Sequence, residues 1–110
     1  KGMRVEFRVP DATCNPYPLV AATLLAGLDG IVRRIDPERP VETNAYELKD
    51  AEPLPNNLKE ALDALKKDSF MVESLGRGLV EEFIKMKEME WDEYHSMVTD
   101  WERRSYIPIF

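Results

Sequence analysis

The residues best suited to chemistry stand near the start of the chain, in an alternating run of charged and apolar side chains. Arg4, Glu6 and Arg8 share one side of residues 3–9, and apolar residues share the other. A carboxylate between two guanidiniums can hold a divalent cation while the guanidiniums grip anionic substrates. A half-buried strand with a solvated charged face explains the same pattern, and spacing alone does not separate the two interpretations.

Cysteine and histidine chemistry is disfavoured, because each residue occurs once. Cys14 and His95 leave the chain without an internal disulfide and with too few ligands of these types for a zinc site. A cysteine nucleophile needs a histidine beside it, and these two lie far apart in the sequence. We therefore expect Cys14 to pack rather than react. The single cysteine and the absence of a basic, then apolar, leader predict a cytoplasmic location.

The charge balance argues against two classes of partner. The sequence has 15 lysines and arginines against 21 aspartates and glutamates, a net charge of -6. Such a chain repels phosphate backbones and anionic lipid. Its most apolar stretch, residues 19–28, is far shorter than the roughly 20 residues that span a bilayer. We therefore expect neither a nucleic acid nor a membrane partner.

The charged run must be positioned by the elements that follow it. Asn15 and Pro16 form an N-cap and first-turn pair, which predicts a helix that begins there. This helix is apolar nearly all round, so we expect it to be buried on most of its faces. Residues 36–57 are rich in proline and charge and predict an irregular connection, with residues 41–48 as its most regular piece.

The second half of the chain predicts four helices. A capping pattern at Asn57 precedes an amphipathic helix of about three turns. A short helix follows over residues 70–75, and a long helix with an aromatic stripe begins near Gly78. A second capping box at residues 99–102 predicts a break and a short final helix.

The expected fold class is α+β, a predominantly helical chain with one N-terminal strand over residues 1–9 and a helical scaffold over residues 16–110. One strand followed only by helices cannot form a sheet, because its backbone groups lack partners. We therefore expect a fragment whose neighbouring strands come from polypeptide upstream of Lys1. The charged face of residues 4–8 then lines a cavity.

Several sequence motifs occur in a fixed order along the chain. They are R-V-E-F-R at 4–8, N-P-Y at 15–17, A-G-L-D-G-I at 26–31, N-A-Y-E-L at 44–48 and W-E-R at 101–103. In this order they resemble glutamine synthetase, in its bacterial and archaeal type I form. The resemblance covers essentially the whole chain. It implies that residues 1–110 are the C-terminal part of that family's catalytic domain, which has a creatine-kinase-like α/β fold.

The resemblance implies an ATP-dependent ligase that joins glutamate to ammonia through γ-glutamyl phosphate, with Mg²⁺ or Mn²⁺ in the site. By this match Glu6 is a metal ligand. Arg4 and Arg8 are the catalytic residues, Arg4 toward the ATP phosphates and Arg8 holding the glutamate substrate. Tyr46 aligns with a tyrosine that some members adenylylate, although the same surroundings occur in members that are never modified.

The resemblance also implies partners. In this family the other metal ligands lie upstream of the matching region, and the sites form between neighbouring subunits of a dodecamer. We therefore expect the rest of the catalytic domain, an N-terminal domain and a homo-oligomer as partners, and an isolated fragment that is inactive. Two alternatives stay open: a γ-glutamyl ligase of the same fold that uses another amine, and a helical module that binds another protein.

Overall fold

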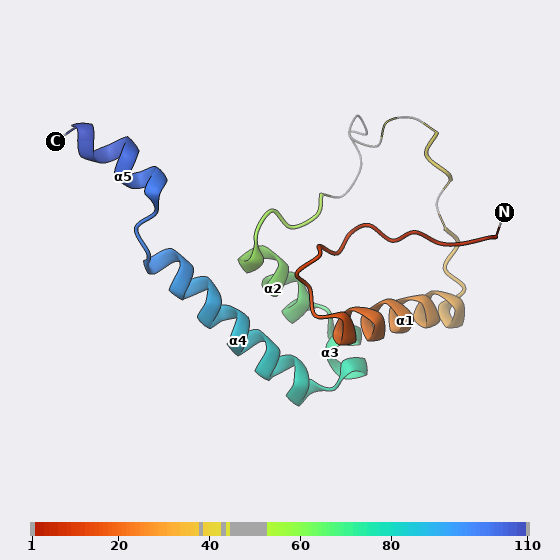
Figure 1. Ribbon diagram of the computed structural model, residues 1–110. Helices are drawn as coiled ribbons and strands as arrows, with labels where there is room; N and C mark the ends of the chain where they lie inside the picture. Colours follow the sequence, from red (N-terminus) through yellow and green to blue (C-terminus); the bar gives the residue numbers. More distant parts are fainter. Residues whose placement is uncertain (1, 38, 43, 45–52, 110) are drawn as a thin grey trace.

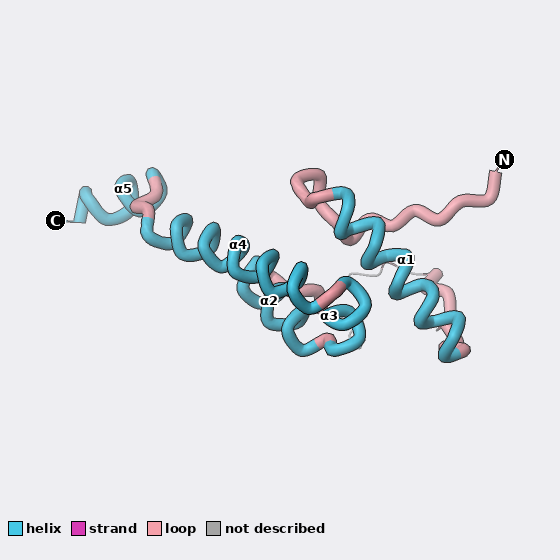
Figure 2. Tube along the Cα trace, turned by 90° about the horizontal axis from the view of Figure 1, so that it is seen from below, coloured by secondary structure: helices cyan, strands magenta, loops and turns pink. Residues whose placement is uncertain are grey.

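The computed structural model describes residues 2–37, 39–42, 44 and 53–109, which form helices joined by turns and irregular segments (Figure 1). The helices are α1 (Pro16–Arg33), α2 (Leu58–Lys67), α3 (Ser69–Leu75), α4 (Arg77–Ser96) and α5 (Asp100–Tyr106), followed by the 3-10 turn η2 (Ile107–Ile109). α3 packs against α1, α2 and α4, and α2 also packs against α4. α5 continues away from the far end of α4, at the opposite end of the molecule from α1 (Figures 1 and 2).

α1 begins and ends at recognisable caps. The Asn15 side chain accepts a hydrogen bond from the Tyr17 backbone N–H at 3.1 Å, and Pro16 occupies the first turn. The helix ends before Arg34, whose backbone adopts the left-handed conformation with φ of 53°. The predicted start of this helix is confirmed. Neither α1 nor any other described helix is long and apolar enough to cross a membrane.

Local signals also define the later helices. Asn57 accepts a hydrogen bond from the Glu60 backbone N–H at 2.9 Å, and Thr99 forms a reciprocal capping box with Glu102 at the start of α5. α3 and α4 meet at Gly76, whose φ of 95° favours glycine. The four helices predicted in the second half are confirmed.

The buried core of the described residues is small. Leu62 of α2 and Val80 of α4 are 2% and 3% exposed, and no other described hydrophobic residue is buried. The sequence predicts burial of α1 on most faces, but its Val20, Leu24 and Leu28 remain more than half exposed. α3 is the one described helix that packs against α1, so much of the α1 surface stays open. The prediction that α1 is buried on most of its faces is therefore wrong for this chain by itself.

The expected N-terminal strand is absent, so the α+β prediction is wrong: the described residues are helical, with no strand among them. Residues 2–9 instead form an irregular segment that leads to the turn before α1 (Figure 1). A strand is defined by backbone hydrogen bonds to a neighbour, and the described part of the chain offers residues 2–9 none. The described residues between α1 and α2 also lack helix and strand.

The chain has much more surface than a compact protein of its size. Its accessible surface is 10,525 Å², whereas a folded monomer of 12.7 kDa exposes about 6,200 Å². Its radius of gyration is 18.6 Å, against about 13 Å for a compact domain of this length. The helices therefore present large faces that nothing within the described residues covers.

Candidate active-site segment

The charged N-terminal segment brings Glu6 and Arg8 together and leaves Arg4 apart. Arg8 donates a hydrogen bond from Nε to Oε1 of Glu6 at 2.7 Å, and its Nη2 lies 2.6 Å from the same oxygen as an ion pair. The side chains of Arg8 and Glu6 are 81% and 53% exposed, so the pair is open to solvent. Arg4 makes no ion pair with any described residue. Tyr46 lies outside the described residues.

Only the end of the same segment lies against α1. Phe7 and Pro10 line a shallow hollow of about 260 Å³ together with Leu19, Val20 and other residues of α1. Phe7 is still 55% exposed, because the hollow is shallow. The segment thus meets α1 through Phe7 and Pro10, whereas Met3 and Val5 are almost fully exposed. The Glu6–Arg8 ion pair remains available to a ligand.

A short turn connects the charged segment to α1. Asp11 Oδ1 accepts hydrogen bonds from the Thr13 hydroxyl at 2.7 Å and from the Thr13 backbone N–H at 2.5 Å. These bonds, the hydroxyl bond first, lower the pKa of Asp11, because they stabilise its ionised form. Cys14 follows in this turn and is exposed. The expectation that Cys14 packs is wrong here, because no described element covers the turn.

The segment offers one candidate metal ligand. Glu6 supplies the hard oxygen donor that Mg²⁺ and Mn²⁺ prefer, and its Oε2 accepts no hydrogen bond from the described residues. No group of three histidine, cysteine, aspartate or glutamate side chains comes together in the described part of the chain. Glu6 therefore fits a divalent cation as a single ligand, and further ligands must come from elsewhere.

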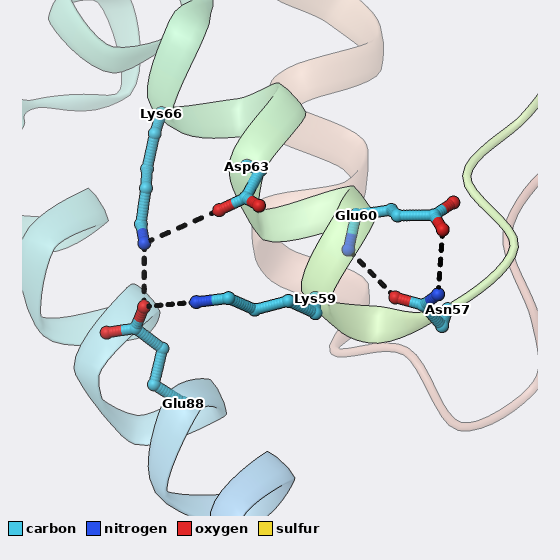
Figure 3. Close-up of polar contacts among 6 residues, drawn as sticks. All are labelled: Asn57, Lys59, Glu60, Asp63, Lys66 and Glu88. Atoms are coloured by element: carbon cyan, nitrogen blue, oxygen red, sulfur yellow. Dashed lines mark hydrogen bonds and ion pairs between the residues drawn. The ribbon is translucent and has the colours of Figure 1, made fainter.

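A second charged cluster, formed by Lys59, Asp63, Lys66 and Glu88, joins α2 to α4 (Figure 3). Glu88 Oε1 accepts hydrogen bonds from Lys66 Nζ at 2.6 Å and from Lys59 Nζ at 3.3 Å. Lys66 Nζ also lies 3.8 Å from a carboxylate oxygen of Asp63. The hydrogen bond between Lys66 and Glu88 lowers the pKa of Glu88 and raises the pKa of Lys66.

This cluster connects α2 to α4, because the two lysines of α2 form ion pairs with Glu88 of α4. The sequence analysis missed it. The available signal was the seven-residue spacing of Lys59 and Lys66, which places both on one side of α2. Their acidic partner, Glu88, belongs to a different helix and could not be assigned from spacing.

An apolar groove of about 780 Å³ lies between α1, α3 and α4. Leu25 of α1, Leu75 of α3 and Phe83 of α4 are among its lining residues. Its one carboxylate, Glu82, forms an ion pair with Lys85 at 2.6 Å. The groove therefore has the chemistry of a packing surface rather than of a reaction site.

Comparison with known proteins places the segment in a family. Residues 1–106 match the family described as glutamine synthetase, catalytic domain. The chain is 43% identical to the glutamine synthetase of Methanococcus maripaludis over 99% of its length, and 42% identical to that of Thermotoga maritima over 97%. It is 45% identical over 99% of its length to the glutamate-methylamine ligase of Methyloversatilis universalis. The chain spans 26% of each of these relatives, about a quarter of their length.

The three-dimensional arrangement is also similar to a solved structure. The structure of apo GmaS without ligand matches with a TM-score of 0.82 at 40% identity, over 91% of this chain and 24% of that one. The similarity therefore extends from the sequence to the placement of the helices. Together with the match over residues 1–106, it shows that this chain belongs to the glutamine synthetase catalytic-domain family.

Proposed function

We propose that these residues form part of the active site of an ATP-dependent glutamate-ammonia ligase. The family match over residues 1–106 carries this proposal, supported by relatives whose names specify glutamine synthesis or glutamate ligation. Because the chain spans about a quarter of those relatives, we propose the activity for a larger protein to which it contributes. In the reaction, the γ-carboxylate of glutamate attacks the γ-phosphorus of ATP and ADP leaves. Ammonia then attacks the acyl carbon, and phosphate leaves with the two electrons of the broken C–O bond and takes up the proton that the nitrogen loses.

The three charged residues of the segment have distinct roles in this proposal. Glu6 would hold Mg²⁺ or Mn²⁺, which would supply positive charge beside the phosphates when bound. Arg4, which has no partner among the described residues, has all its donors free for the phosphoryl oxygens of ATP. Arg8 binds the glutamate substrate, for which its planar guanidinium gives bidentate recognition. Their exposure in this chain is consistent with a site that other polypeptide completes.

The wider assembly belongs to the same proposal. We propose that the remaining metal ligands come from other parts of the protein, including an N-terminal domain. We also propose that the protein is a cytoplasmic homo-oligomer with sites between subunits. The excess surface of about 4,000 Å² over a compact monomer supports extensive contacts of this kind. A single exposed cysteine is consistent with a reducing compartment.

A second candidate function is ligation of glutamate to methylamine. The relative of that name is as similar to this chain as the two glutamine synthetases are. Arg4, Glu6 and Arg8 have the same roles in both candidates, because both use ATP, glutamate and a divalent cation. The choice between ammonia and methylamine therefore depends on residues that bind the amine.

The deciding experiment is an amine competition assay on the full protein. The protein is given ATP, glutamate and Mg²⁺ with ammonium or methylamine, and both phosphate release and the mass of the amide product are measured. We expect a higher kcat/KM for ammonium, with glutamine as the product. A higher kcat/KM for methylamine selects the second candidate. The ligase proposal fails if neither amine gives ATP-dependent amide formation.

A further inference from the structure

We propose that Arg8 works through two edges of its guanidinium: one edge orients Glu6 toward a divalent cation, and the other receives an anionic group of the substrate. This inference rests on the proposed function, which makes Glu6 a metal ligand. It goes further by giving Arg8 a positioning role toward the cation in addition to its contact with substrate.

The first edge is already engaged. Nε and Nη2 lie along one side of the guanidinium plane. Nε donates a hydrogen bond to Oε1 of Glu6 at 2.7 Å, and Nη2 lies 2.6 Å from the same oxygen as an ion pair. This planar edge holds the oxygen more firmly than a single flexible ammonium could. Oε2 has no hydrogen-bond partner in the described part of the chain, so it is the oxygen available to a cation. Carboxylate ligands in metal sites are commonly oriented by such outer hydrogen bonds.

The second edge is free. A guanidinium has five N–H donors, and the hydrogen bond to Glu6 uses the one on Nε, with Nη2 beside the same oxygen. Nη1, at the end of the group, makes no hydrogen bond or ion pair with a described residue. The Arg8 side chain is 81% exposed, so a carboxylate or phosphoryl group can reach this end and bind through two parallel hydrogen bonds. The Arg8 guanidinium then links Glu6, the ligand of the cation, to the anionic group of the substrate.

Arg4 is a natural control for the charge of Arg8. It lies two residues from Glu6 on the other side, with the same charge and on the same face of the segment. It makes no contact with Glu6, however. Removal of either arginine takes a positive charge away from the cation, which favours cation binding. Removal of Arg8 alone also releases the Glu6 carboxylate, which disfavours it.

The test measures manganese binding to the full protein without substrates, from the EPR signal of free Mn²⁺. Wild type is compared with Glu6→Gln, Arg8→Gln, Arg8→Lys and Arg4→Gln. The Mn²⁺ sites that Glu6→Gln loses are the class of sites to which the comparison refers. We expect Arg8→Gln to raise the Mn²⁺ dissociation constant of that class about tenfold, although it removes a positive charge. Arg8→Lys keeps the charge without the planar fork, so its value should lie between those of wild type and Arg8→Gln. Arg4→Gln should leave Mn²⁺ binding unchanged or tighten it.

The outcomes separate this inference from the function on which it rests. If Glu6→Gln weakens Mn²⁺ binding but Arg8→Gln tightens it as Arg4→Gln does, Arg8 acts as a charge only and the inference is wrong. If Glu6→Gln leaves Mn²⁺ binding unchanged, the metal-ligand role of Glu6 in the proposed function is itself wrong. Circular dichroism of each variant shows whether its helical content is preserved.

Discussion

Arg4 and Arg8 carry the same charge at the same sequence distance from Glu6, yet their surroundings differ. Arg8 forms a hydrogen bond and an ion pair with the Glu6 carboxylate, whereas Arg4 has no ion pair with any described residue. A free guanidinium suits a group on which charge develops during reaction, because all of its donors can turn toward that charge. At the residue scale, the two arginines are therefore suited to different steps.

Replacement of Arg4 tests this difference through catalysis. In the full protein, Arg4→Gln should lower kcat at saturating ATP and glutamate about 100-fold, the usual cost of one lost donor to transition-state charge. Steady-state phosphate release measures the effect. Arg33→Gln is the matched control, since Arg33 carries the same charge but pairs with Asp29 of its own helix at 3.1 Å. Equal losses in both variants would contradict a specific role for Arg4.

The capping box of α5 gives a prediction about pH. Oε2 of Glu102 accepts hydrogen bonds from the Thr99 backbone N–H at 2.7 Å and from the Thr99 hydroxyl at 2.8 Å. These bonds, the backbone bond first, lower the pKa of Glu102 below its ordinary value of 4.5. A lowered pKa means that the bonds stabilise α5 above pH 4.5, and that this contribution is lost as the pH falls through the lowered pKa.

Hydrogen–deuterium exchange of the peptide that covers α5 measures this effect, after correction for intrinsic exchange rates. In wild type, protection should fall between about pH 5 and about pH 3, the range in which glutamate side chains take up a proton. Glu102→Gln should already have reduced protection at neutral pH and should lose the pH dependence. Glu93→Gln, whose carboxylate has no ion pair among the described residues, is the control. An identical pH profile in Glu102→Gln and wild type would exclude the carboxylate as the cause.

At the element scale, α2 and α4 are joined by two different kinds of contact. Leu62 and Val80 are the buried hydrophobic residues of the described chain. The ion pairs of Glu88 with Lys59 and Lys66 lie on the surface of the same pair of helices. Exposed ion pairs contribute little to stability, because water screens them, so the apolar contact should dominate.

Substitutions at both kinds of contact test this ranking. Leu62→Ala should lower the free energy of unfolding by about 2–4 kcal/mol, because it removes buried apolar surface and leaves a cavity. Glu88→Gln should have a much smaller effect that vanishes at high salt. Denaturant unfolding at low protein concentration, followed by tryptophan fluorescence, measures the free energy of unfolding of both variants. Leu79→Ala is the control, since Leu79 is 62% exposed. A cost for Leu79→Ala as large as that for Leu62→Ala would contradict the ranking.

The helices were predictable from sequence because their signals are local. Asn15 with Pro16, Asn57, Gly76 and Thr99 each act within a few residues of the helix end that they define. The alternation of residues 3–9 predicted a strand, but a strand also needs a neighbour, which the described residues do not supply.

Properties that depend on distant residues were not predictable in the same way. Exposure of Cys14 and of α1 depends on what covers them, and the sequence of an element does not show this. The sequence identified Arg4, Glu6 and Arg8 as candidates but could not show that Glu6 pairs with Arg8 rather than Arg4. Both arginines are two residues away, and side-chain rotamers decide between them.

At the scale of the whole molecule, exposed apolar surface is the dominant feature. The chain exposes about 4,000 Å² more than a compact monomer of its mass. Leu24 and Leu28 lie four residues apart on α1 and are 63% and 58% exposed. A second apolar surface, the groove between α1, α3 and α4, lies on another side of the same helix. α1 therefore has the surface of a helix that packs on more than one side.

This surface predicts how the 110-residue chain behaves when it is prepared alone. Unpartnered apolar faces favour association, so sedimentation velocity should show oligomers whose population rises with concentration, and the chain should bind the dye ANS. The double substitution Leu24→Gln and Leu28→Gln removes apolar surface from one exposed strip of α1 while leaving the caps at Asn15 and Arg34 in place. It should shift the association to higher concentration, with helical content unchanged by circular dichroism. A chain that stays monomeric at all concentrations and binds no ANS would mean that its helices close over this surface in solution. In that case the large exposed area could no longer support the proposal that these residues work inside a larger protein.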